Sequence, residues 1–168
     1  MADIKYHAKA EYVHALAVLA AERLGSWIRA VRPDAFVPVP VHPDRRITRG
    51  YNQAELLAEA LSEILAETDT GSSNVGGQRK IPVRSELLIR TKKTEAQKEL
   101  TAEGRLLNLQ NAFTVTEDLR DRPQRPRIML IDDIYTTGAT LNACAEELLY
   151  AGAADVYGLC IAAGADIS

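Results

Sequence analysis

Apolar residues near the start of the chain follow a helical period, from Ala8 to Val31. Their three- and four-residue spacing is typical of a helix that buries one stripe. Pro33 ends this helix, because the residue before a proline avoids the helical conformation. Similar patterns cover residues 52–66 and 139–151, the latter followed by Gly152. The sequence therefore predicts three amphipathic helices.

Short apolar runs between these helices predict strands at residues 36–41, 85–90, 112–115 and 154–162. Prolines within the first run indicate a strand that is short or lies near an edge, because proline cannot donate to a ladder. Residues 128–131 are four consecutive large apolar side chains, which is typical of a strand covered on both faces. Strands that alternate with helices predict an α/β fold with a mainly parallel sheet.

Length and composition fit a single domain. The chain has 168 residues, of which 46% are hydrophobic, and this is enough for one core. We therefore expect residues 1–168 to form one domain, with polar, flexible loops at about residues 68–80 and 91–104.

Charge and hydropathy narrow the function classes. A formal net charge of -3 gives no footprint for bulk nucleic-acid binding, which normally requires a strongly basic domain or stripe. Any anion site should therefore be local. The polar N-terminus is unlike a signal peptide, and no apolar run approaches the ~20 residues that cross a bilayer. We expect a soluble, cytoplasmic protein with two buried thiols, Cys144 and Cys160.

Residues 128–140 (IMLIDDIYTTGAT) combine a buried strand, two carboxylates and a small-residue turn before a helix. Asp132 and Asp133 are expected at the carboxyl end of the strand, where open α/β sheets bind ligands. Their acceptor oxygens suit vicinal hydroxyls or a hydrated metal ion. The following residues can direct backbone N–H groups and hydroxyls at a phosphate, and Gly138 allows a close approach. This pattern predicts a sugar-phosphate site.

Two other interpretations of this segment make different demands on its residues. Asp132 and Asp133 could cap a turn, with the threonines as ordinary helix-start residues. A dinucleotide fold or a P-loop would need its own glycine-rich fingerprint, and neither fingerprint occurs in this turn.

The same segment resembles the signature of type I phosphoribosyltransferases. That resemblance implies that Asp132 and Asp133 hold the ribose hydroxyls of phosphoribosyl pyrophosphate and bind Mg²⁺, directly or through water. It also implies a loop that cradles the 5-phosphate. The residues of this loop are Thr136, Thr137, Gly138, Ala139 and Thr140.

The resemblance extends along the chain in the order found in the ComF/GntX-type, competence-associated phosphoribosyltransferase family. The matching stretches are Lys5-Tyr6, residues 38–55 (PVPVHPDRRITRGYNQAE) and residues 90–113 (RTKKTEAQKELTAEGRLLNLQNAF). The chain is identified as a member of this family. Typical members begin with a cysteine-rich zinc-binding segment, which this sequence does not contain, so no zinc is expected.

Family position also assigns two polar loops. Arg45, Arg46 and Arg49 correspond to a pyrophosphate-binding loop, and guanidinium groups pair well with phosphate oxygens. Lys92, Lys93 and Gln97 fall in the segment that corresponds to a flexible loop closing over the substrate. A solvated loop without such a role is the alternative for these last residues.

Two functions follow from the resemblance. The first is transfer of the phosphoribosyl group to an unidentified nitrogen acceptor, with release of pyrophosphate. Purine-using relatives commonly carry an aspartate at the place of Thr136, so a purine acceptor is less expected. The second is a non-catalytic or regulatory protein of the DNA-uptake machinery that keeps the pocket. Its expected partners are competence-machinery proteins, single-stranded DNA and a second copy of the chain.

Overall fold

The computed structural model describes residues 2–41, 50–69, 80–91 and 112–163. The elements are α1 (Ala2–Val31), β1 (Ala35–Pro38), α3 (Gln53–Asp69), β2 (Leu88–Arg90), β3 (Phe113–Val115), β4 (Arg127–Tyr135), α5 (Ala139–Tyr150) and β5 (Asp155–Ala163). The order of helices and strands agrees with the sequence analysis. None of the helices in these ranges is long and apolar enough to cross a membrane.

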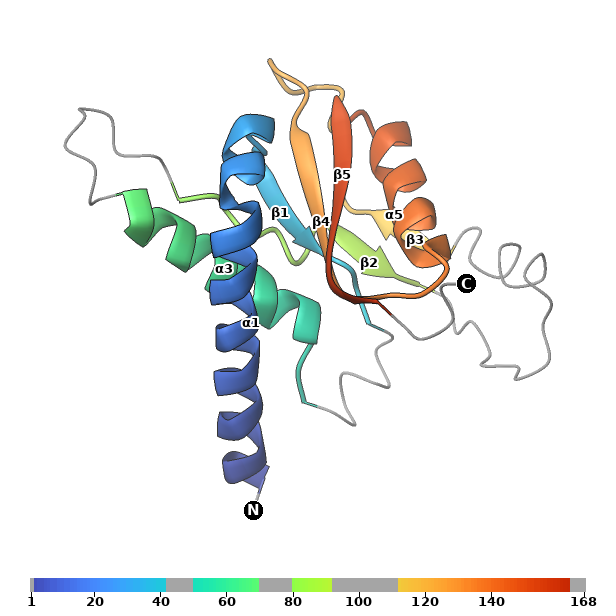
Figure 1. Cartoon of the computed structure of the whole chain (residues 1–168). Helices are drawn as coiled ribbons and strands as arrows, with labels where there is room; N and C mark the ends of the chain where they lie inside the picture. The colour runs from blue at the N-terminus through green and yellow to red at the C-terminus, as the bar shows by residue number, and fades with distance from the viewer. Residues whose placement is uncertain (1, 42–49, 70–79, 92–111, 164–168) are drawn as a thin grey trace.

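A parallel sheet in the order β1-β4-β5 forms the centre of the fold (Figure 1). β1 is short and lies at one edge of this sheet, as its prolines predicted. Beyond it, Phe36 makes an isolated parallel bridge to Val83. β2 and β3 form a separate antiparallel pair. The α/β fold with a mainly parallel sheet is therefore confirmed.

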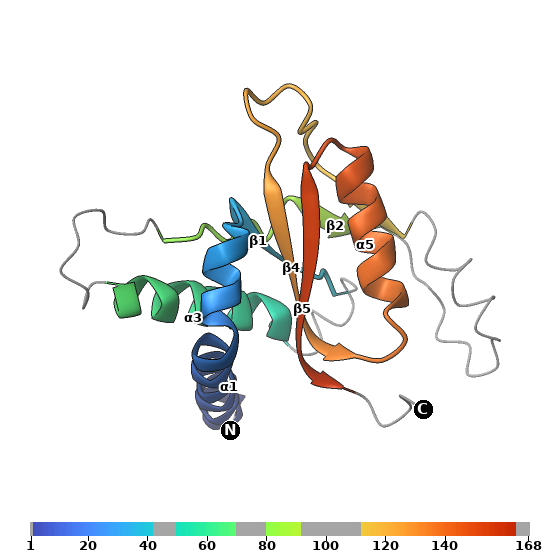
Figure 2. The ribbon, with the colours of Figure 1, turned by 45° about the horizontal axis from the view of Figure 1, so that its top comes forward.

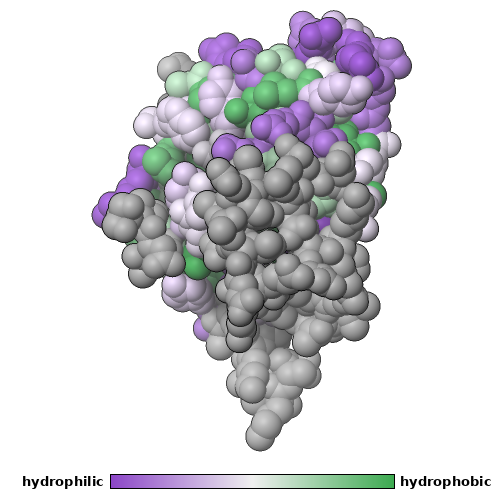
Figure 3. All heavy atoms as spheres, turned by 90° about the vertical axis from the view of Figure 1, so that its right-hand side faces the viewer, coloured by the Kyte–Doolittle hydropathy of each residue, from purple (hydrophilic) through white to green (hydrophobic). Residues whose placement is uncertain are grey.

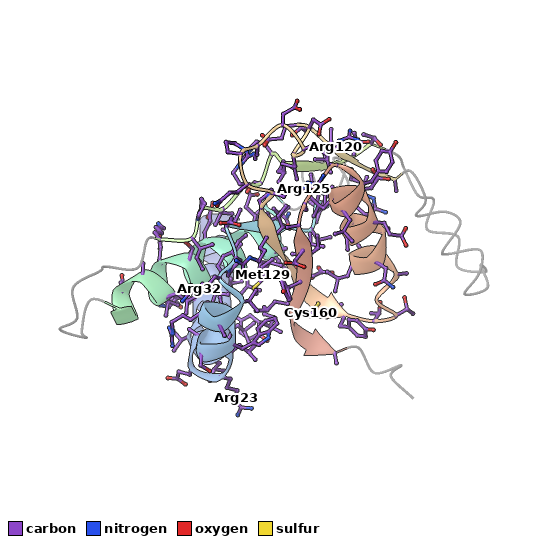
Figure 4. All side chains as sticks on the ribbon, turned by 90° about the horizontal axis from the view of Figure 1, so that it is seen from above. Arg23, Arg32, Arg120, Arg125, Met129 and Cys160 are labelled. Carbon is purple, nitrogen blue, oxygen red and sulfur yellow. The ribbon has the colours of Figure 1, made fainter. Side chains whose placement is uncertain are left out.

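Both faces of the sheet are covered. α1 and α3 lie on one side, and α5 lies on the other (Figure 2). Successive residues of β4 alternate between two apolar cores: Met129 and Ile131 pack with α1 and α3, whereas Ile128 and Leu130 pack with α5 and the β2–β3 pair. Met129 is labelled in the view from above (Figure 4). This alternation explains why the sequence of β4 is apolar at consecutive positions.

β4 is longer than the sequence predicted, and this corrects the placement of the carboxylates. The strand continues past Ile131 to Tyr135, and Asp132 pairs with Cys160 while Tyr135 pairs with Ala163. A backbone ladder does not require apolar side chains, so the change to polar residues did not end the strand. Asp132 and Asp133 consequently lie within the last part of β4, and the bend begins only after Tyr135.

An ion-pair network joins the segment before β2 to the segment after β3. Arg84 donates hydrogen bonds to Glu86 (2.9 Å) and to Glu117 (2.8 Å). The Arg84 side chain is 27% exposed and that of Glu117 is 34% exposed. These hydrogen bonds raise the pKa of Arg84, and the hydrogen bond from Arg84 lowers the pKa of Glu117.

Arg84→Ala should lower the free energy of unfolding by about 1 kcal/mol at pH 7, which a urea titration would measure. A carboxyl with a lowered pKa contributes stability that is lost as pH falls through that pKa, so the difference should shrink in acid. Lys80→Ala is the matched control. The Lys80–Glu63 pair has side-chain exposures of 57% and 63%, so its removal should change stability little. Equal effects of the two substitutions would contradict the prediction.

Candidate functional site

The carboxylates of Asp132 and Asp133 lie half-buried near the end of β4. The backbone N–H of Asp133 donates to Oδ1 of Asp132 (3.0 Å). Burial, followed by the negative charge of Asp133, raises the pKa of Asp132 to about 7. Two adjacent carboxyls that are withdrawn from water favour ligands that neutralise them, such as hydroxyl donors or a cation.

Both cysteines are close enough to this pair to respond to it. Burial is the main cause that raises the pKa of the Cys144 thiol on α5, and the charge of Asp132 adds to it. Cys160, labelled on β5 in Figure 4, has its pKa raised to about 11, again by burial first and then by the two carboxylates. Within the described ranges, no three or more His, Cys, Asp or Glu side chains are grouped to hold a metal ion.

The bend after β4 is open toward the start of α5. Gly138 is the N-cap residue, with φ 75° and ψ -5°, and it provides no side-chain cap. Its carbonyl accepts from the N–H of Asn142 (2.9 Å), and Oγ1 of Thr137 accepts from the N–H of Ala139 (3.4 Å). Among the described residues, none accepts a hydrogen bond from the backbone amides of Thr140 and Leu141.

These two amides point to an anion site. The first amides of a helix lack intrahelical acceptors, and the helix dipole adds partial positive charge there. A phosphate at this place would satisfy both of them. The side chains of Thr136 and Thr137 are exposed beside the bend, so their hydroxyls are accessible. β4 leads through this bend directly into α5 (Figure 2), which keeps carboxylates and amides within one short segment.

The remaining predicted site residues lie outside the described ranges. Arg45, Arg46 and Arg49 fall in residues 42–49, and Lys92, Lys93 and Gln97 fall in residues 92–111. Their assignment to pyrophosphate and to a closing loop stays a prediction.

Asn52 is a buried polar residue that the sequence analysis did not single out. Its side chain is buried (7% exposed). Nδ2 donates to the carbonyl of Val39 (3.0 Å), and Oδ1 accepts from the N–H of Ala54 (3.1 Å). Asn52 therefore ties the end of β1 to the start of α3, the two ends of the segment that carries the three arginines. An asparagine just before a helix is a capping signal, but its bond to Val39 cannot be read from local sequence.

Asn52→Ala should lower the free energy of unfolding by about 1–2 kcal/mol, because it removes the cap and leaves the Val39 carbonyl buried without its donor. Denaturant titration would measure this loss. Gln53→Ala, one residue further along and half-buried, is the control and should cost much less. A loss of the same size at both positions would show that Asn52 has no special role.

A hollow of about 640 Å³ lies beside the bend, between the start of α5 and β5. Tyr135 and Gly138 line it on the side of the bend, and Asn142 and Cys160 line it from α5 and β5. No charged side chain is part of its described lining. In the coloured part of the space-filling view, apolar atoms are interspersed with polar ones (Figure 3).

Solved structures with a similar arrangement define the fold of this chain. A hypoxanthine phosphoribosyltransferase of Trypanosoma cruzi aligns with 92% of this chain and 75% of its own, with a TM-score of 0.50 and 13% identity. A glutamic acid mutant from a study of an invariant aspartic acid in HPRTs aligns with 94% of this chain and 79% of its own, with a TM-score of 0.51 and 14% identity. The chain has the type I phosphoribosyltransferase fold.

Similarity to curated relatives identifies the family. Competence protein F of Haemophilus influenzae is 37% identical over 124 residues, which are 74% of this chain and 48% of the relative. DNA utilization protein YhgH of Escherichia coli K12 is 35% identical over 130 residues, covering 77% and 49%. Competence protein ComFC of Bacillus subtilis is 29% identical over 157 residues, covering 92% and 54%.

The chain belongs to the ComF-type phosphoribosyltransferase family, as its sequence resemblance implied. It spans about half the length of these curated relatives. A search of protein-family models found no match.

Proposed function

We propose that this chain binds phosphoribosyl pyrophosphate and transfers its phosphoribosyl group to a nitrogen acceptor, with release of pyrophosphate. The observation that supports this most directly is the pairing of two half-buried carboxylates with open amides at the mouth of α5. Carboxylates suit ribose hydroxyls, and helix-start amides suit a phosphate. A sugar phosphate carries both groups.

In this proposal, Asp132 and Asp133 accept hydrogen bonds from the two ribose hydroxyls. The 5-phosphate lies in the loop of residues 136–140, where it accepts hydrogen bonds from the threonine hydroxyls and from the open amides of Thr140 and Leu141. Two adjacent carboxylates are also a sufficient protein contribution for Mg²⁺, which usually completes its shell with water and substrate phosphate oxygens. Bound there, the metal would neutralise charge on the leaving group.

The transfer step needs little covalent chemistry from the protein. The acceptor nitrogen bonds to the anomeric carbon as the bond from that carbon to the pyrophosphate oxygen breaks. Pyrophosphate keeps the electron pair, and the acceptor releases its proton to solvent. Fixing the ribose and the 5-phosphate at two neighbouring points restricts the orientation of the anomeric carbon, which is where positioning accelerates a reaction. Arg45, Arg46 and Arg49, with Lys92, Lys93 and Gln97, are proposed to stabilise the leaving pyrophosphate.

The second candidate is a regulatory protein that binds the same sugar phosphate without turnover. It is favoured by the names of the relatives, which refer to competence and to DNA utilization rather than to an enzyme activity. In that case the partners would be cytoplasmic proteins of the DNA-uptake machinery, single-stranded DNA or a second copy of the chain. Both candidates require the same pocket.

Two measurements test the proposal. Isothermal titration with phosphoribosyl pyrophosphate and Mg²⁺ should show saturable binding, and ribose 5-phosphate should compete for the same site. Pyrophosphate release should then be followed with a panel of amine and base acceptors. Binding with release for at least one acceptor supports the enzyme. Binding without release for any acceptor favours the regulatory protein, and no binding excludes both.

A further inference from the structure

We propose that Tyr135 is a positioning residue. Its aromatic ring packs against Gly138 and thereby fixes the shape of the phosphate-binding bend. This inference rests on the proposed function of the bend. The proposed function uses the two carboxylates and the open amides but gives Tyr135 no role. The inference predicts that Tyr135 preorganises the bend for its ligand.

The contact between the two residues is close. A Cβ atom placed on Gly138 would lie 2.8 Å from Oη, 3.0 Å from Cε2 and 3.1 Å from Cζ of Tyr135. The hydroxyl end of the ring therefore occupies the space in which any side chain at position 138 would begin. Tyr135 itself is held at the end of β4 by its pairing with Ala163.

Ordinary burial does not explain this placement. Tyr135 is 39% exposed, and within the described chain its hydroxyl has no hydrogen-bond partner. The ring instead lies against the one residue of the bend that has a left-handed backbone, with φ 75°. It also lines the hollow between α5 and β5. Its observed contacts are with the bend and with the surface next to it.

The ring of Tyr135 limits the backbone freedom of Gly138, which as a glycine would otherwise have more conformational freedom than most residues. Glycine populates left-handed and right-handed conformations with similar ease, so a bare Gly138 would sample several bend shapes. The carbonyl of Gly138 accepts the first helical hydrogen bond, from Asn142 (2.9 Å). Holding Gly138 in one conformation therefore keeps the start of α5 formed and its free amides in place before the phosphate arrives.

Four variants and the wild type test this contact, with titration of phosphoribosyl pyrophosphate and Mg²⁺ as the readout. Tyr135→Phe keeps the ring and should bind within twofold of wild type. Tyr135→Ala should bind about tenfold more weakly, because binding must then order the bend. Gly138→Ala should also bind at least tenfold more weakly, since its methyl group meets the ring and its backbone is strained.

The double variant Tyr135→Ala/Gly138→Ala is the decisive one. Removing the ring makes room for the methyl group, so the double variant should lose less than the product of the two single losses. Tyr150→Ala is the control: this tyrosine is 80% exposed at the other end of α5 and should leave binding unchanged. Circular dichroism would verify that every variant is folded.

Hydrogen exchange gives a readout that does not require the ligand. The Asn142 amide should exchange faster in Tyr135→Ala than in wild type, and at the wild-type rate in Tyr135→Phe, because its acceptor is the Gly138 carbonyl. An equal loss of binding in Tyr135→Phe and Tyr135→Ala would overturn the inference in favour of a direct contact by the hydroxyl. Independent losses in the double variant, or unchanged exchange at Asn142, would also overturn it. If the wild type binds no phosphoribosyl pyrophosphate, the proposed function fails, while the exchange measurement still decides the role of the ring.

Discussion

Asp132→Asn is expected to make the free protein more stable at pH 8 while weakening its binding of phosphoribosyl pyrophosphate about 100-fold, close to 2.7 kcal/mol. Both effects have the same origin. The carboxyl is partly withdrawn from water beside Asp133, so its negative charge is unfavourable in the free protein. The same charge is what accepts a ribose hydroxyl in the proposed complex.

The pH dependence gives this prediction its sign. The pKa of Asp132 is raised to about 7 in the folded protein, whereas an unfolded aspartate titrates near 3.9. Well below pH 4 the carboxyl is protonated in both states and imposes no penalty. As pH rises toward 7, the unfolded state loses its proton first, so the stability of the wild type falls. The penalty is complete above the folded pKa.

Denaturant titrations at pH 4.5 and pH 8 would measure this penalty. At pH 8 we expect Asp132→Asn to gain about 1–3 kcal/mol in free energy of unfolding, with most of the gain absent at pH 4.5. Asp155→Asn removes an exposed carboxylate at the start of β5 and should change neither stability nor binding. A variant that loses stability at pH 8, or that binds as tightly as wild type, would show that Asp132 is not the strained, ligand-binding carboxyl proposed here.

The fold could be predicted from local sequence because each of the two apolar cores requires apolar residues at regular spacings along the helices and strands that form it. β4 alternates between two apolar cores, so its consecutive apolar residues indicated a covered strand. The ends of elements were less well predicted. α1 begins at Ala2 rather than at Ala8, because a helix once nucleated can extend through residues that have no apolar stripe. β4 runs to Tyr135 because its partner β5 continues, and that pairing is not local.

The candidate site also has a part that local sequence predicted and a part that it did not. Its central chemistry lies in consecutive residues, from Asp132 to Thr140, and could therefore be predicted from one segment. Asn52 and Tyr135 were missed because their contacts depend on the folded chain. Asn52 bonds to a carbonyl thirteen residues away. The position of the Tyr135 ring over Gly138 follows from the direction in which the bend turns.

Gly152→Ala is expected to destabilise the protein by about 3 kcal/mol or more, the largest stability effect that we predict for a single methyl group. Gly152 has φ 109°, a conformation that strains any L side chain. A Cβ atom would lie 2.5 Å from Cγ and 2.8 Å from the backbone N of Arg120. The backbone atom cannot move away easily, because the neighbouring Leu119 N–H donates to the Ala151 carbonyl (2.9 Å).

This substitution tests the C-terminal end of α5, whereas the phosphate-binding bend lies at its N-terminal end. The turn at Gly152 leads from α5 into β5, with the amides of Gly152 and Ala153 donating to Leu149 and Leu148 (both 3.0 Å). Gly158→Ala is the matched control, because its added methyl group would meet Leu141 at an ordinary 3.5 Å and should change stability by less than about 1 kcal/mol. Urea titration of the two variants at pH 7 would compare them. Equal stabilities would mean that the turn accommodates a side chain at position 152, so that α5 is not fixed against Arg120 in the way the structure shows.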